Sequence, residues 1–217
     1  MSRLSALFFA RVQAAPFYRR LHEEAIGLLP SGQGQVWLDV GCGPGLVSRL
    51  AHRRGYRVTG VDADPAMVRQ AQRQARHLAP EGPRFQVGRL GELGLALGGA
   101  ADVVSAASLL AVLPDRPGAL RDLLQLLRPG GTLLLIEPSA LMSPQSVRRY
   151  LAGQPGLRDA WVLRLWARTR QPARLVQAAD LAVPGFTLRQ HPLLGGLVNA
   201  WLLTPRATGL KLVEPTP

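Results

Sequence analysis

The feature that most constrains the fold is a short apolar run followed directly by a glycine-rich turn. Val36–Val40 is apolar, the segment Gly41-Cys-Gly-Pro-Gly45 holds three glycines, and a helical pattern then covers Gly45–Arg54. Glycine costs about 0.5–1 kcal/mol in the interior of a regular element, so three together indicate a special backbone path. The order strand, glycine turn and helix predicts a site where backbone N–H groups and a helix N-terminus approach a ligand.

The three glycines have different expected roles. We expect Gly41 to permit the tight turn, Gly43 to let the backbone approach a ligand, and Gly45 to bring the helix close to the sheet. Asp62 follows about 20 residues later at the end of the next strand, the distance at which a carboxylate takes ribose hydroxyls. The spacing is G-x-G-x-G, whereas the dinucleotide fingerprint is G-x-G-x-x-G. A purely structural strand-to-helix turn is the competing interpretation.

Strands and helices alternate through the middle of the chain, which predicts an α/β protein with a doubly wound parallel sheet. The further expected strands are Arg57–Val61, Arg84–Val87, Ala101–Ser105 and Thr132–Ile136. The expected helices between them are Asp64–Leu78, with Asp64 as N-cap, and Pro117–Leu127. In such sheets ligands bind beyond the carboxyl ends of the strands, where the strand order reverses.

The two ends of the chain have a different pattern. Helical segments are expected at Ser2–Leu29, broken by Pro16, at Ser143–Gln171, broken at Pro155-Gly156, and at Pro172–Leu181. Two strands, Phe186–His191 and Leu197–Leu203, are close enough in sequence that they must pair antiparallel. The tail from Pro205 is expected to be loose.

Four motifs in order resemble those of class I S-adenosylmethionine-dependent methyltransferases. They are LDVGCGPG, RVTGVDADPAMVRQAQ, ADVVSAASLLAVLPD and LLRPGGTLLLIEP. The chain is similar to the small-molecule methyltransferases of ubiquinone and menaquinone biosynthesis. The resemblance implies a seven-stranded, Rossmann-like sheet of order 3-2-1-4-5-7-6 with an antiparallel last strand. Residues 1–217 would form one domain, with a helical cap at 1–30 and a helical lid at 143–181 between strands 5 and 6.

The resemblance also implies a cofactor, S-adenosylmethionine, with S-adenosylhomocysteine as the product. Its methionine part would be held by Asp39 and by the backbone of Gly41, Cys42, Gly43 and Gly45. Asp62 would take the ribose hydroxyls, Ala63 and Met67 would lie beside the adenine, and Ala106 would offer its carbonyl to the amino group. Many relatives place an aspartate at position 89, where this chain has Arg89, so the backbone of Leu90 or the side chain of Glu92 would serve there instead.

The catalytic group is less defined than the cofactor site. Many relatives carry two histidines where this chain has Ala111 and Val112, so that position offers no base. His191 and Tyr18 are the candidate catalytic residues, each with a structural role as the alternative. The remaining histidines have no metal-ligand spacing, and we expect no metal.

The net charge of +12 leaves several partners open. A small-molecule acceptor, apolar or anionic, is the leading interpretation, and an RNA methyltransferase or RNA-binding relative is the alternative. The fourth motif lacks the Asn/Asp-Pro-Pro-Tyr/Phe pattern of enzymes that methylate DNA bases. A single cysteine is consistent with a cytoplasmic setting.

Segment 157–174 is rich in arginine and carries Trp161 and Trp166. It is expected to be an amphipathic lid over the acceptor site. Peripheral membrane contact and RNA contact are the alternatives, because a basic amphipathic helix can also lie on an anionic surface. The oligomeric state does not follow from the sequence.

Overall fold

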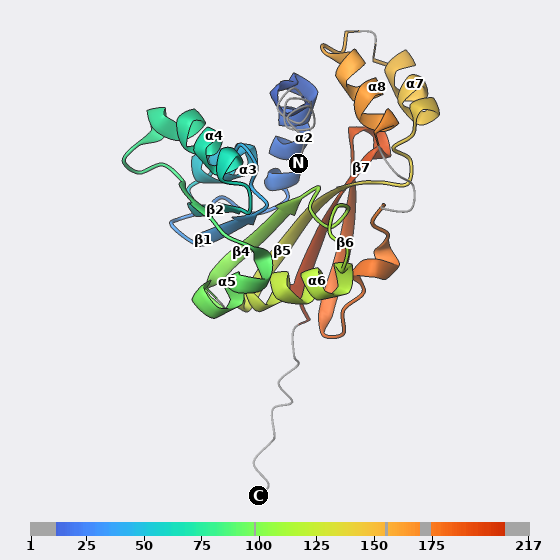
Figure 1. The fold of residues 1–217 in the computed structure, drawn as a ribbon. Helices are drawn as coiled ribbons and strands as arrows, with labels where there is room; N and C mark the ends of the chain where they lie inside the picture. Colours follow the sequence, from blue (N-terminus) through green and yellow to red (C-terminus); the bar gives the residue numbers. More distant parts are fainter. Residues whose placement is uncertain (1–11, 98, 155, 170–174, 207–217) are drawn as a thin grey trace, which may run out of the picture.

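The computed structural model describes residues 12–97, 99–154, 156–169 and 175–206. Its centre is one seven-stranded sheet of order β3-β2-β1-β4-β5-β7-β6 (Figure 1). The strands are β1 Val36–Val40, β2 Arg57–Asp62, β3 Arg84–Val87, β4 Ala101–Ala107, β5 Leu127–Pro138, β6 Phe186–Leu193 and β7 Val198–Pro205. Strands β1 to β5 pair in parallel, and β7 runs antiparallel to both β5 and β6. The expected fold class and strand order are confirmed.

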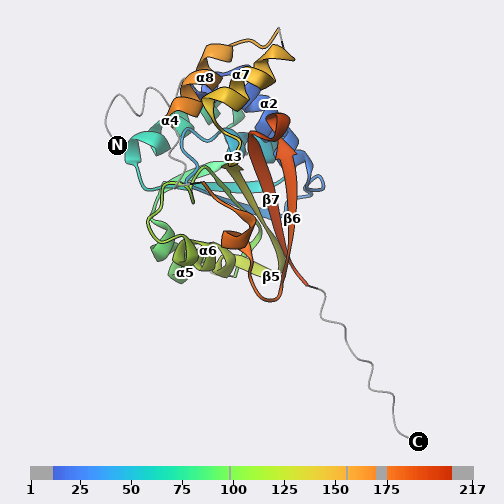
Figure 2. The same ribbon diagram turned by 90° about the vertical axis from the view of Figure 1, so that its right-hand side faces the viewer.

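The helices cover both faces of the sheet. They are α2 Pro16–Gly27, α3 Leu46–Arg53, α4 Pro65–Ala75, α5 Leu90–Leu97, α6 Arg116–Gln125, α7 Pro144–Ala152 and α8 Ala160–Arg168, with short 3-10 helices η1 Arg76–Leu78, η3 Ala178–Leu181 and η4 Leu194–Gly196. One core contains buried side chains of α2, α3, α7 and α8. A second core contains those of α5 and α6 on the opposite face (Figure 2).

Helix α4 begins where its sequence predicts. The Asp64 carboxylate accepts a hydrogen bond from the Ala66 N–H at 2.8 Å, and Pro65 occupies the first turn. A side-chain cap of this kind satisfies one of the N–H groups that the first turn leaves without an intrahelical partner. The cap therefore fixes the direction in which the chain leaves Asp62 at the end of β2.

The sheet register aligns the ends of the strands that build the site. Val40 pairs with Val61 on one side and with Ala106 on the other. Between β1 and β4 the strand order reverses, because the chain first moves outward through β2 and β3 and then returns. A crevice at the carboxyl ends of β1, β2 and β4 is the expected binding place in such a sheet.

Several expected boundaries differ from the structure, most by one to three residues. Strand β4 continues two residues beyond Ser105, to Ala107, and β5 begins at Leu127, before the expected Thr132. The pairing of β4 with β5 is irregular near Ala101, which lets the Pro-Gly-Gly segment remain within the strand. The expected helix 172–181 is wrong in its described part: residues 175–177 are not helical, and a 3-10 helix covers only 178–181.

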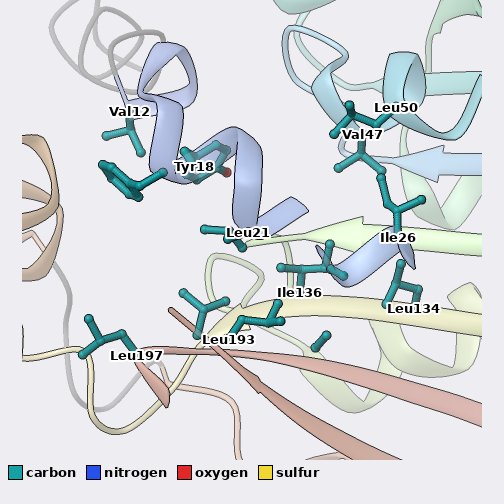
Figure 3. Close-up of a cluster of buried hydrophobic side chains, with 14 of the residues drawn as sticks. Val12, Tyr18, Leu21, Ile26, Val47, Leu50, Leu134, Ile136, Leu193 and Leu197 are labelled. Atoms are coloured by element: carbon teal, nitrogen blue, oxygen red, sulfur yellow. The ribbon is translucent and has the colours of Figure 1, made fainter. Parts of the chain in front are cut away.

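The expected N-terminal helix lies partly outside the described residues, which begin at position 12. Residues 12–14 are helical, the chain bends at Ala15, and Pro16 begins α2, so the helical segment is broken at Pro16 as predicted. Proline fits this first turn because no N–H donor is needed there. The buried side of α2 packs with side chains of α3 and of the strand ends, as Figure 3 shows for Tyr18, Leu21 and Ile26.

The two tryptophans of α8 face opposite ways. Val162, Leu163 and Trp166 are buried in the first core, whereas Trp161 is 50% exposed. The two tryptophans cannot share one covered side, because Trp166 follows Trp161 by five residues, which turns the helix by about 140°. The lid role of 143–181 stays a prediction.

Candidate functional site

A cavity of about 560 Å³ opens at the carboxyl ends of β1, β2 and β4. This volume is within the range of ordinary small-ligand sites. Its lining comes from the β1–α3, β2–α4 and β4–α6 connections and from the N-terminal segment. The lining residues are Gln13, Tyr18, Gly41, Gly43, Pro44, Asp62, Ala63, Asp64, Pro65, Met67, Ala107, Ser108, Leu109 and Val112.

The glycine turn has a backbone that other residues adopt only with strain. Gly41, Gly43 and Gly45 have φ angles of 68°, 53° and 77°, all in the left-handed region. A Cβ on Gly45 would lie 2.7 Å from the Phe85 ring and 3.0 Å from the Ala71 Cβ, so this glycine lets α3 and its neighbours pack together. A Cβ on Gly43 would instead point toward the Gln13 amide, at 3.3 Å. Gly45 therefore supports packing, and Gly43 faces the cavity.

Asp62 connects the end of β2 to the glycine turn. Its Oδ2 accepts from the Gly43 N–H at 2.8 Å, and its Oδ1 accepts from the Asp64 N–H at 2.9 Å. Burial raises the pKa of this carboxyl above its usual value, and the two backbone hydrogen bonds oppose that shift. Each carboxylate oxygen has a further acceptor position, so Asp62 can still accept two ligand hydroxyl groups.

Asp39 lies behind the turn rather than in the cavity. It is 1% exposed, and its two oxygens accept from the Ser48 hydroxyl at 2.6 Å and the Ser105 hydroxyl at 2.8 Å. Ser105 in turn accepts from the Trp37 indole at 2.8 Å. Burial raises the pKa of Asp39 to about 6, against the opposing effect of the two hydroxyls. Asp39 therefore ties β1, α3 and β4 together from behind the turn, and its expected contact with the cofactor stays a prediction.

The N-terminal segment closes one side of the cavity. Gln13 and Tyr18 both line it, and they come from residues before and within α2. The Gln13 Oε1 atom is buried and has no hydrogen-bond partner among the described residues. A buried acceptor without a hydrogen bond costs free energy, and a ligand that donates a hydrogen bond to it would remove that cost. Gln13 could not be identified from the sequence, because it lies before α2 and outside every recognised motif.

Tyr18 is held between two other rings. Its ring centroid lies 4.3 Å from that of His22 and 5.6 Å from that of Trp166. His22 is buried, and its Nδ1 lies 2.7 Å from the Tyr18 carbonyl oxygen. Burial lowers the pKa of His22 to about 4, so this imidazole is neutral at pH 7. These contacts give Tyr18 a fixed place at the wall of the cavity.

Several sequence-predicted residues do not line the cavity. Ala106 is fully buried within the sheet, paired with Val40 and Leu135, because β4 is longer than expected. Ala107 and Ser108 take its place at the wall. Ser108 has a φ of 54°, and its N–H donates to the Ile136 carbonyl at 2.8 Å.

The remaining cofactor candidates outside the lining are Cys42, Arg89 and Leu90. Cys42 is buried beneath the turn, and burial raises the pKa of its thiol, with the nearby Asp39 and Asp62 charges adding to this. A thiol of this kind is not a nucleophile at neutral pH. Arg89 is exposed just before α5, and Leu90 is half-buried against the second core. Ala63, Pro65 and Met67 supply the apolar wall on that side of the cavity.

His191 is distant from the cavity. His191 lies in β6, and two strands, β7 and β5, separate β6 from β4. Across the sheet the paired positions are His191, Ala200, Ile136 and Ala107, in that order. Three inter-strand spacings of about 4.8 Å separate His191 from the cavity wall, roughly 14 Å in all. The structure therefore does not bring His191 to the site, because β6 forms the far edge of the sheet.

The wall contributed by the β4–α6 connection is apolar. Leu109 and Val112 both line the cavity, and Val112 is 51% exposed at its rim. Val112 occupies one of the positions where a histidine was considered from the sequence. Among the described lining residues, the titratable side chains are Tyr18, Asp62 and Asp64. This wall can contact an apolar group but provides no imidazole.

Two other kinds of site are absent from the described residues. No group of three or more His, Cys, Asp or Glu side chains is placed to hold a metal ion in the part of the chain that the structure describes. Among the helices described, none is long and apolar enough to cross a membrane.

Residues 38–135 match the family model for a methyltransferase domain. The chain is 35% identical over 122 residues to the malonyl-[acyl-carrier protein] O-methyltransferase of Serratia marcescens, a match that covers 56% of this chain and 45% of that protein. It is 30% identical over 172 residues to a ubiquinone biosynthesis O-methyltransferase of Albidiferax ferrireducens, with 76% and 66% covered. The chain thus spans about half the length of the curated relatives it matches.

Solved structures share the fold. The magnesium protoporphyrin IX methyltransferase of Synechocystis PCC 6803, solved with bound S-adenosylhomocysteine, superposes with a TM-score of 0.69 at 19% identity, covering 94% of this chain and 95% of that one. A methyltransferase from Aquifex aeolicus gives a TM-score of 0.65 at 16% identity, with 90% and 97% covered. At these identities the likeness concerns the fold.

Proposed function

This chain belongs to the S-adenosylmethionine-dependent methyltransferases, and from that membership we propose that it transfers a methyl group to a small-molecule acceptor. The observation that supports this most directly is the hydrogen bond from the Gly43 N–H to the Asp62 carboxylate, because both residues line one wall of a ligand-sized cavity. A carboxylate and a glycine backbone placed together in this way fit a ribose and the chain attached to it.

The residues present fit the cofactor. A Cβ on Gly43 would narrow the cavity in front of Gln13, and glycine leaves this space open. The buried Oε1 of Gln13 has no hydrogen-bond partner among the described residues, so it can accept from a ligand. We assign the ribose hydroxyls to Asp62, the adenine to the wall of Ala63 and Met67, and the amino-acid part to the Gly41–Gly43 turn with Gln13. The bound cofactor would supply an activated methyl group, which is chemistry that no side chain provides.

The protein's contribution to the reaction is positioning. Alignment of two reactants can account for about 7–11 kcal/mol of a barrier when they are held in a near-attack geometry. Tyr18, fixed between His22 and Trp166, and the apolar pair Leu109 and Val112 border the space left for an acceptor. We assign Tyr18 to acceptor or cofactor contact rather than to proton removal.

We further propose that the acceptor atom is an oxygen that is already ionised, such as a carboxylate. The curated relatives named above are O-methyltransferases. The described lining contains no histidine, and its two carboxyl groups, Asp62 and Asp64, both lie on the β2–α4 side. An ionised oxygen needs no general base, and the net charge of +12 favours the approach of an anion.

Titration calorimetry with S-adenosylmethionine and S-adenosylhomocysteine tests the first part of the proposal. Transfer of a labelled methyl group to matched aliphatic carboxylates, phenols and amines tests the second. Carboxylate turnover with little pH dependence above pH 6 is expected. Preference for amines or phenols would contradict the acceptor proposal but leave the cofactor assignment intact. Absence of cofactor binding would contradict both, and methylation of RNA in place of small acids would favour the alternative function.

A further inference from the structure

The outer side of α8 combines exposed apolar and basic side chains. Trp161 and Leu165 are 50% and 36% exposed, while the other three tryptophans of the chain are at most 3% exposed. Arg164 and Arg168 are exposed as well. Because residues at i, i+3, i+4 and i+7 share one side of a helix, these four side chains form one continuous stripe.

The inner side of α8 is already occupied by the protein core. Val162, Leu163 and Trp166 are buried there. The outer stripe therefore does not need to turn inward to complete the fold, and none of its four residues lines the cavity described above. A half-exposed tryptophan beside an exposed leucine is costly in water, and such an exposed pair usually marks a contact surface.

The surroundings of the stripe are positively charged. Helix α7 lies beside α8 (Figures 1 and 2) and exposes Arg148 and Arg149. Arg158 is exposed just before α8 begins. None of the exposed arginines of α7 and α8 forms an ion pair with another residue that the structure describes. Their charge is therefore available to an anionic partner.

We propose that this outer stripe of α8, with the adjoining arginines of α7, docks the protein on an anionic lipid bilayer. Tryptophan and arginine are the side chains that suit a membrane interface, where an amphipathic ring or stem enters the headgroup region and the polar end stays hydrated. Each arginine near an anionic leaflet adds to the attraction, and the apolar pair inserts. The stripe is short, so binding is peripheral and reversible, and the outer side of a packed helix can engage a membrane without unfolding the core.

The full chain provides its own probe for this contact. The tryptophans other than Trp161 are buried, so a blue shift of emission on adding phosphatidylcholine–phosphatidylglycerol vesicles reports Trp161. Flotation with the same vesicles measures binding directly. We expect both signals with the mixed vesicles, neither with pure phosphatidylcholine, and loss of both as salt is raised. The Trp161→Phe variant should still float but lose the blue shift.

Matched variants separate the stripe from the general charge. Replacing Arg164 and Arg168 by glutamine should weaken vesicle partition about 30-fold, whereas the same change at Arg73 and Arg76 on α4 and η1 should have less than a threefold effect. Leu165→Ser should weaken partition, and Val87→Ser, at an exposed apolar position on β3, should not. Circular dichroism verifies that each variant is folded.

Three results would overturn the proposal. One is absence of binding to the mixed vesicles by the folded wild-type chain. A second is equal loss of binding in the α8 and α4 arginine pairs, which would indicate attraction by net charge alone. A third is binding of an RNA homopolymer that depends on Arg164 and Arg168 without any vesicle binding, which would assign the stripe to nucleic acid.

Discussion

The ring of Tyr18 meets that of Trp166 edge-on, with centroids 5.6 Å apart and planes inclined by 66°. Tyr18 lines the cavity and Trp166 belongs to the buried side of α8. Helix α8 therefore influences the site through one aromatic contact, although no described residue of α8 is itself at the cavity wall. The two tryptophans of α8 have separate roles as a result.

We expect Trp166→Ala to lower the free energy of unfolding by about 3–5 kcal/mol, because it empties a fully buried aromatic position. Trp161→Ala should change it by less than about 0.5 kcal/mol, because that side chain is half exposed. Urea unfolding followed by far-ultraviolet circular dichroism measures both. Similar losses for the two variants would mean that a different side of α8 packs against the core.

Asp62→Ala should weaken S-adenosylmethionine binding by about 1.5–3 kcal/mol, roughly 10- to 150-fold, because a carboxylate that accepts ligand hydroxyls is lost. Titration calorimetry gives the affinity. Asp122→Asn on α6, outside the cavity lining, is the matched control and should bind normally. Unchanged affinity in a folded Asp62→Ala variant would remove Asp62 from the ribose site.

Gly43→Ala should mainly weaken cofactor binding, whereas Gly45→Ala should mainly lower stability. Both place a side chain at a left-handed φ, which costs about 1–2 kcal/mol. Gly45→Ala adds a clash with the Phe85 ring at 2.7 Å, so we expect the larger loss of stability there. At Gly43 the added methyl group projects toward the cavity, so binding should fall more than stability. Thermal unfolding with and without S-adenosylmethionine distinguishes them, and equal profiles would contradict the division of roles.

The sheet and its turn could be predicted because local pattern determines them. The apolar run before Gly41 and the acidic residue at the end of β2 are each visible within a few positions. The burial of Asp39 could not be predicted, because a carboxylate beside the turn gives no indication of its hydrogen bond with Ser105, 66 residues away. The position of His191 could not be predicted for a similar reason: its distance from the cavity depends on the order of the last two strands relative to β4.

The N-terminal wall of the cavity was anticipated only in part, since Tyr18 was a candidate residue and Gln13 was not. Both side chains reach the cavity because the N-terminal segment packs on the first core, and no local sequence signal states where a helix will pack. The two faces of α8 show a related limit. The amphipathic pattern was evident, but which tryptophan is buried depends on which side of α8 packs in the first core.

Two buried groups should give opposite contributions to the pH dependence of stability. The pKa of Asp39 is raised from 3.8 to about 6 in the fold, so the folded chain binds this proton more tightly than the unfolded chain. Its contribution to stability is therefore present below pH 3.8 and is lost as pH rises to about 6, by about 3 kcal/mol in all. The pKa of His22 is lowered from 6.5 to about 4, so its contribution is lost as pH falls through that window.

Between pH 4 and 6 these two contributions oppose each other, and single variants should separate them. Relative to wild type, Asp39→Asn should gain stability as pH rises from 4 to 6, by up to about 1.4 kcal/mol per pH unit. His22→Gln should lose stability relative to wild type over the same interval. Urea unfolding at several pH values checks both signs. Parallel curves for wild type and Asp39→Asn would show that the carboxyl titrates normally in the fold.

The last prediction concerns Gln13, whose buried Oε1 lacks a partner among the described residues although its side chain lines the cavity. Removing an unsatisfied buried acceptor should leave the ligand-free chain as stable or more stable, because no protein hydrogen bond is lost. Binding should respond in the opposite direction, since a ligand donor such as an ammonium group would lose its acceptor. We therefore expect Gln13→Met, which keeps a similar length, to preserve the unfolding free energy while weakening S-adenosylmethionine binding about tenfold, or about 1.4 kcal/mol. Gln13→Glu keeps the acceptor and should retain most of the affinity. If Gln13→Met lowered stability and left calorimetric binding unchanged, Gln13 would be a packing residue of the N-terminal segment and the cofactor wall would begin at Tyr18.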